Sequence, residues 1–74
     1  MTQNELINII TKYILDNNVK KNMSTLELYN QILLEKNIVM DDEYLIYWGY
    51  IQCKNFLNAV TYYKPIFIEA VHLK

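Results

Sequence analysis

The sequence has very few of the residues that cross-link a small protein, bind metal ions in it or form its turns. Its 74 residues contain one cysteine, one glycine, one proline and one histidine. A single cysteine, Cys53, cannot form an internal disulfide, and Cys53 together with His72 provides too few ligands for a structural zinc site. A single glycine also excludes the glycine-rich loop that holds phosphates in nucleotide-binding proteins. We therefore expect neither a metal nor a cofactor.

The chain also has no arginine, because all seven of its basic residues are lysines. The formal net charge is −1, which argues against a nucleic-acid binder that uses a broad basic surface. The absence of arginine removes the side chain that most often reads guanine or grips phosphate. Lysine without arginine, together with abundant Asn, Ile and Tyr, is typical of AT-rich genes. We interpret this as a low-GC source, such as a bacterium, a phage, a mobile element or an AT-rich virus.

Long hydrophobic runs are missing as well. The longest uninterrupted apolar stretch, with glycine not counted as apolar, is 44–48. It is far shorter than the roughly 20 residues that a helix needs to cross a bilayer. The N-terminal segment is interrupted by Glu5, Asn8 and Lys12, so it does not have the pattern of a secretory leader. We expect a cytoplasmic protein, in the host cytoplasm if the source is viral, with no membrane partner.

Hydrophobic residues nevertheless make up 53 % of the chain, which is high for a small domain with so much surface. So short a chain holds only one core, and we expect a single domain, residues 1–74. Such a core rarely gives more than about 3–5 kcal/mol of stability on its own. Association with a second copy or with a partner protein would bury part of the excess apolar surface.

Three segments begin with the residue pattern of a helix start. In 1–6 (MTQNEL) and 23–28 (MSTLEL), a methionine precedes a hydroxyl N-cap, and a glutamate and a leucine follow at the third and fourth helical positions. This spacing predicts a capping box and a hydrophobic staple at both places. The third segment, 40–45 (MDDEYL), keeps the N-cap, here Asp41, and the staple, and its acids complement the positive end of the helix dipole.

Hydrophobic periodicity sets the extent of the first two helices. We expect them at about 3–17 and about 25–36. Their expected core residues are Leu6, Ile7, Ile9, Ile10, Tyr13 and Ile14 in the first, and Leu26, Leu28, Tyr29, Ile32 and Leu33 in the second. After the second helix, Asn37 can adopt the left-handed conformation, so that Ile38 folds back on Leu33 in a Schellman-type end.

Two later segments can be read as helix or as strand. Residues 44–51 are apolar on every side and rich in strand-favouring residues, but the N-cap before them and the helical periodicity after them favour one long helix over about 42–63. Gly49 is the expected place of any bend. In 65–73, Pro65 suits the first turn of a short helix, while Ile66–Ile68 has strand character. The expected fold class is mainly α, with three helices and a short C-terminal helix or strand. The alternative is an α+β, winged-helix-like domain.

No arrangement of residues supports catalysis. Ser24 is expected to serve as a helix cap, Cys53 lies among apolar neighbours, and His72 is two residues from the C-terminus. The adjacent acids Asp41 to Glu43 point in different directions on a helix, so they do not form an oxygen cage for a cation. We expect that the chain is not an enzyme.

The third helix has more apolar surface than one core needs. One side gathers Leu45, Ile46, Gly49, Cys53, Phe56, Leu57 and Val60, which form a sufficient core face. The other side carries Tyr44, Tyr47, Trp48, Ile51, Lys54, Asn55 and Asn58. Because tyrosine and tryptophan commonly anchor interfaces, we predict that this second side binds a partner protein, or a second copy in a homodimer. The function would be that of a non-catalytic adaptor or inhibitor. In the competing interpretation, the first two helices flank the third and bury both sides.

The alternative function is a helix-turn-helix or winged-helix DNA-binding regulator. Three helices with a short middle one fit that outline. Its third helix, however, has Lys54 as its only base and begins with three acids, where a recognition helix meets phosphates. Lys20, Lys21 and Lys54 would have to supply the contacts with DNA.

Overall fold

The computed structural model describes residues 1–17, 19 and 23–72, with side chains described as far as residue 60. Three helices make up this part of the chain: α1 (Gln3–Asp16), α2 (Thr25–Glu35) and α3 (Glu43–His72). The predicted mainly α fold is confirmed. The described residues contain no strand, so the α+β alternative is wrong there. Both ambiguous segments, 44–51 and 65–72, belong to α3, and the expected C-terminal element is the end of that helix.

α1 begins with the predicted capping box. The Thr2 hydroxyl accepts a hydrogen bond from the Glu5 amide at 3.1 Å, and the Thr2 amide donates to the Glu5 carboxylate at 3.3 Å. These two bonds satisfy amide groups that the first turn of a helix leaves without partners.

The starts of α2 and α3 differ from the prediction. Ser24 has the extended backbone of an N-cap, but its side chain makes no capping hydrogen bond, so the predicted capping box is wrong at α2. At α3 the Leu45 amide donates to the Asp42 carboxylate at 3.2 Å. Asp42, rather than Asp41, therefore caps this helix, and α3 begins at Glu43.

α2 ends in the predicted Schellman motif. Asn37 has a φ angle of 54°, in the left-handed region. The Ile38 amide donates to the Leu33 carbonyl at 2.9 Å, and the Asn37 amide donates to the Leu34 carbonyl at 3.2 Å. This pair of bonds closes the helix and turns the chain toward the start of α3.

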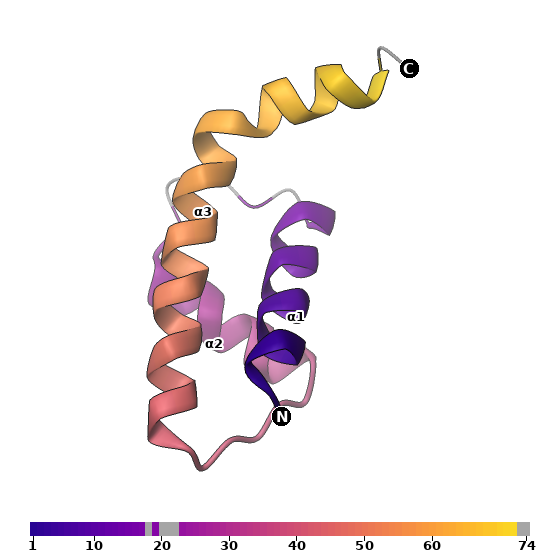
Figure 1. Ribbon diagram of the computed structural model, residues 1–74. Coiled ribbons are helices and arrows are strands. Elements are labelled where there is room, and N and C mark those ends of the chain that lie inside the picture. Colours follow the sequence, from indigo (N-terminus) through magenta and orange to yellow (C-terminus); the bar gives the residue numbers. More distant parts are fainter. Residues whose placement is uncertain (18, 20–22, 73–74) are drawn as a thin grey trace.

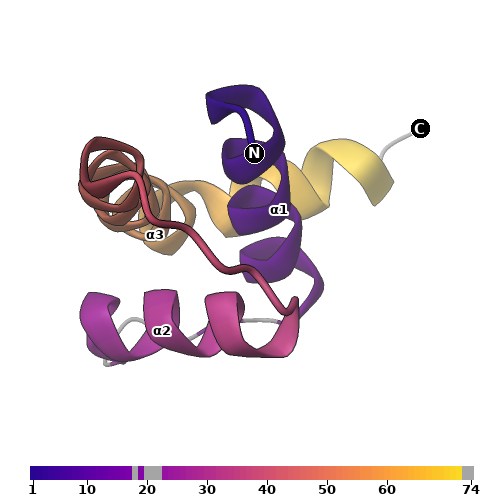
Figure 2. The ribbon, with the colours of Figure 1, turned by 90° about the horizontal axis from the view of Figure 1, so that it is seen from below.

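α3 packs against both of the other helices. Figure 1 shows α1 and α3 side by side and running in the same direction, and Figure 2 shows α2 lying across them. α1 makes most of its contacts with α3, whereas α1 and α2 touch each other little. The radius of gyration is 13.0 Å, larger than the roughly 11 Å of a compact domain of this length. The difference arises because the C-terminal part of α3 turns away from α1 and α2 (Figure 1).

The bend in α3 has a cause in the sequence. Pro65 lies inside the helix. A proline there has no N–H for the bond to the fourth preceding residue, and helices bend on that account. In Figure 1 the bend lies in the orange part of α3, before its yellow end.

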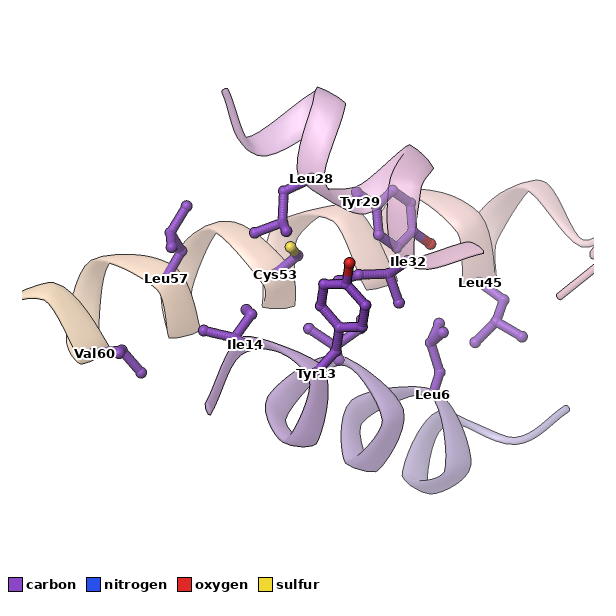
Figure 3. Packing of buried hydrophobic residues seen from close by; sticks show 11 residues of the cluster. Leu6, Tyr13, Ile14, Leu28, Tyr29, Ile32, Leu45, Cys53, Leu57 and Val60 are labelled. Atoms are coloured by element: carbon purple, nitrogen blue, oxygen red, sulfur yellow. The ribbon is translucent and has the colours of Figure 1, made fainter. Parts of the chain in front are cut away.

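A single hydrophobic cluster joins the three helices (Figure 3). It consists of Leu6, Ile10, Tyr13 and Ile14 from α1, Leu28, Tyr29 and Ile32 from α2, and Leu45, Cys53, Leu57 and Val60 from α3. The sequence pattern predicts every one of these residues as core. Leu26 is the exception among the expected core residues of α2, because its side chain is 56 % exposed. Because α2 crosses α3, the other two helices cover only the middle of the apolar face of α2. The edge of that face that carries Leu26 stays exposed.

Gly49 permits a close approach between the helices. A Cβ atom at this position would lie 2.6 Å from Leu6 Cδ2 and closer still to the hydroxyl oxygen of Tyr29. That hydroxyl donates a hydrogen bond to the backbone carbonyl of Ile46 at 2.8 Å. The missing side chain of Gly49 therefore lets Tyr29 tie α2 to the backbone of α3, and close approach is the role we assign to this glycine in place of the expected bend.

Candidate functional site

The predicted partner-binding residues lie along the side of α3 that faces away from the core. Tyr44 and Tyr47 are 68 % and 66 % exposed, and Lys54, Asn55 and Asn58 are exposed as well. Residues three or four apart are neighbours on a helix surface, so these side chains form one stripe in which Ile51 connects Tyr47 to Lys54. The interpretation in which α1 and α2 bury both sides of α3 is wrong for these five residues.

Two of the predicted residues are only half-exposed. Ile51 lies in the middle of the stripe, and Trp48 packs against the hydrophobic cluster. Removing Trp48 would therefore disturb the fold as well as the surface. We define the outer face of α3 as Tyr44, Tyr47, Trp48, Ile51, Lys54, Asn55 and Asn58, and treat its two exposed tyrosines as the residues that report on the surface alone.

A groove between α2 and α3, with a volume of about 430 Å³, lies beside the outer face. Its walls are Leu26, Tyr29, Asn30 and Leu33 from α2, and Glu43, Ile46, Tyr47 and Tyr50 from α3. Tyr47 belongs to both the groove and the outer face. This groove is absent from the predictions made from the sequence. The available signal was the spacing of Leu26, Asn30 and Leu33, which places them on one edge of α2.

A polar contact links α1 to α2. The Tyr13 hydroxyl accepts a hydrogen bond from Gln31 Nε2 at 2.8 Å. A hydrogen bond to Glu35, reinforced by burial, raises the pKa of Tyr13 above its ordinary value. A phenol held in this way stays protonated at neutral pH, so it supports the packing of the two helices rather than proton transfer.

Cys53, the only cysteine, is buried in the core. Burial raises the pKa of its thiol from 9.0 to about 11. Because the thiolate and not the thiol is the nucleophile, this residue is poorly suited to catalysis near neutral pH.

The buried thiol predicts a loss of stability in alkali. Between pH 9 and pH 11 the unfolded chain releases the Cys53 proton while the folded chain keeps it. The free energy of unfolding should fall across this window, by at most about 1.4 kcal/mol per pH unit from this group. Its contribution is intact below pH 9 and lost by about pH 11. Urea denaturation of the parent and of Cys53→Ala at a series of pH values would measure it. Parallel pH dependence in the two proteins would contradict the prediction.

Other kinds of site find no support in the part of the chain that the structure describes. No three His, Cys, Asp or Glu side chains there lie together as metal ligands. Within the same residues, no helix combines the length and apolar character that crossing a membrane requires. Of the lysines that DNA binding would use, Lys54 is exposed on the outer face of α3, whereas Lys20 and Lys21 lie outside the described residues.

Comparisons with known proteins add no relative to this picture. No protein-family model matches the chain, and searches of curated proteins and of solved structures found no similar protein. The outer face of α3 and the groove beside it are therefore the features that bear on the function.

Proposed function

We propose that the protein is a small non-catalytic interaction domain, an adaptor or inhibitor, that binds protein through the outer face of α3. In the absence of a partner, this face pairs two copies of the chain. The observation that carries the proposal is the exposure of Tyr44 and Tyr47, at 68 % and 66 %, next to a core that closes without them. We place its action in the cytoplasm, that of the host cell if the source is a phage or a virus.

The two halves of the outer face are complementary. Tyr44, Tyr47 and Trp48 precede Ile51, and Lys54, Asn55 and Asn58 follow it at matching distances along the helix. An antiparallel pair of α3 helices centred on Ile51 would set the aromatic half of one copy against the polar half of the other. Lysine over an indole ring and amides beside phenol hydroxyls are favourable contacts. This register supports a second copy as the binding partner.

The surface area is also in keeping with association. The chain exposes 5586 Å², whereas a folded monomer of its mass typically exposes about 4,800 Å². A standard interface buries roughly 800 Å² of each partner, so the chain has surface enough for one.

Replacing both Tyr44 and Tyr47 by alanine should abolish association and leave the fold intact. Neither side chain belongs to the buried cluster, so each substitution should change the free energy of unfolding by no more than about 0.5 kcal/mol. Circular dichroism during thermal unfolding would report the fold, and size-exclusion elution would report the association.

A matched control for this pair is Leu15→Ala, which removes another exposed apolar side chain, on α1 and away from the outer face. It should leave the elution position unchanged. Loss of the helical signal in the double variant would show that the two tyrosines belong to the core, and would overturn the proposed surface.

A further inference from the structure

The groove between α2 and α3 is open to solvent along an apolar edge. Leu26 on one wall is 56 % exposed and Tyr47 on the other is 66 % exposed. Its volume, about 430 Å³, falls within the range of about 300–1,000 Å³ seen for pockets that hold whole ligands. Several apolar side chains of a bound segment would therefore fit between the two helices.

The interior of the groove offers little hydrogen bonding to an occupant. The Tyr29 hydroxyl is already engaged with the Ile46 carbonyl at 2.8 Å. The Tyr29 and Tyr50 rings meet edge to face, with centroids 6.3 Å apart. Leu33 and Ile46 add apolar side chains, and Asn30 and Glu43 are the lining residues, among those described, that are neither aliphatic nor aromatic. An occupant is therefore held by apolar side chains, as when an amphipathic helix lies in a hydrophobic groove.

The charge of the groove indicates which charged side chain a bound segment would carry. Among the described residues that line it, Glu43 is the only charged one. Asp41 and Asp42, both exposed, come immediately before it in the chain. Lys12 and Lys36 line a different hollow, beside Tyr13. One end of the groove is therefore acidic, which complements a lysine or arginine on the bound segment.

We propose that this groove binds an amphipathic helix of a partner protein that carries large apolar side chains on one face and a lysine or arginine beside them, facing Glu43. This inference goes beyond the proposed function, which concerns the outer face of α3. It concerns a surface of its own, since of the outer-face residues only Tyr47 lines the groove.

Two labelled model peptides test the inference. Both are amphipathic helices of about 15 residues, long enough to form a helix on binding, with the same leucine pattern; one carries lysine and the other glutamate on the polar face. Fluorescence anisotropy against the intact chain should show that the lysine peptide binds at least about tenfold more tightly. Equal affinity for both peptides, or no binding of either, would overturn the proposal.

Substitutions then locate the binding. Leu26→Glu should weaken binding of the lysine peptide at least about tenfold, because it places a charge among apolar contacts. Leu34→Glu is the matched control, since it makes the same charge change on the same helix at a residue outside the groove lining. Glu43→Gln should weaken binding by up to about fivefold at low salt. Equal effects of the two glutamate substitutions would show that the peptide is held only by general attraction between charges. That result would overturn the groove as the binding site.

Tyr44→Ala separates this inference from the proposed function. Tyr44 belongs to the outer face and does not line the groove, so its removal should leave peptide affinity unchanged while weakening self-association. If Tyr44→Ala weakens peptide binding and Leu26→Glu does not, the peptide occupies the outer face. The groove proposal then fails and the proposed function survives.

Discussion

Replacing Ile32 by alanine is expected to leave the protein largely unfolded at room temperature. Ile32 is completely buried in the cluster that joins all three helices (Figure 3). Truncating a buried isoleucine to alanine costs about 2–5 kcal/mol, because the lost contacts leave a cavity that closes only partly. A core of this size supplies only about 3–5 kcal/mol in total, so the substitution removes most of the stability.

Leu34→Ala is the matched control for Ile32→Ala. Leu34 lies two residues further along α2 and is 79 % exposed. Its truncation should change the free energy of unfolding by no more than about 0.5 kcal/mol. Urea denaturation followed by circular dichroism, at protein concentrations too low for association, would measure both. Similar costs for the two variants would show that α2 is not packed through the face that carries Ile32.

Replacing Gly49 by alanine is expected to destabilise the protein although alanine is the better helix former. The helix preference alone would favour alanine by about 1 kcal/mol. The new methyl group, however, would collide with the Tyr29 hydroxyl and with Leu6. Overpacking of this kind typically costs about 1–3 kcal/mol, and displacing Tyr29 also loses its hydrogen bond to Ile46, typically worth about 1 kcal/mol. The sum is a net loss.

A double-mutant cycle with Tyr29→Phe would identify the cause of this loss. Phenylalanine removes the oxygen that lies nearest to the added methyl group. Gly49→Ala should therefore cost less in the Tyr29→Phe background than in the parent, a coupling that independent sites would not show. A stabilising Gly49→Ala, or purely additive effects of the two substitutions, would contradict the close approach of α2 to α3.

Local signals in the sequence predicted local structure well. The Thr2–Glu5 capping box and the Asn37 helix end depend on hydrogen bonds between residues no more than five positions apart, so the pattern and the structure carry the same information. The same kind of pattern failed at Ser24, where the backbone forms a cap but the side chain does not. Asp41 and Asp42 can each cap α3, and the pattern alone does not distinguish neighbouring acids.

Features that depend on how the helices cross were harder to predict. Periodicity shows which face of a helix is apolar, but it does not show how far the neighbouring helices extend over that face. It therefore placed Leu26 in the core, where the structure exposes it, and Trp48 on the surface, where the structure packs it against the cluster. The groove has residues from both α2 and α3 in its walls, so no single stretch of sequence describes it.

The central claim is that the outer face of α3 is an interaction surface that the fold does not need. The most direct measurement is native mass by light scattering across a dilution series of the parent chain and of the Tyr44→Ala/Tyr47→Ala variant. We predict that the parent has twice the 8.9 kDa mass of the chain at high concentration and falls to 8.9 kDa on dilution, while the variant remains folded at 8.9 kDa throughout. A parent that stays at 8.9 kDa at every concentration, or a variant with the same mass profile as an associating parent, would contradict the claim.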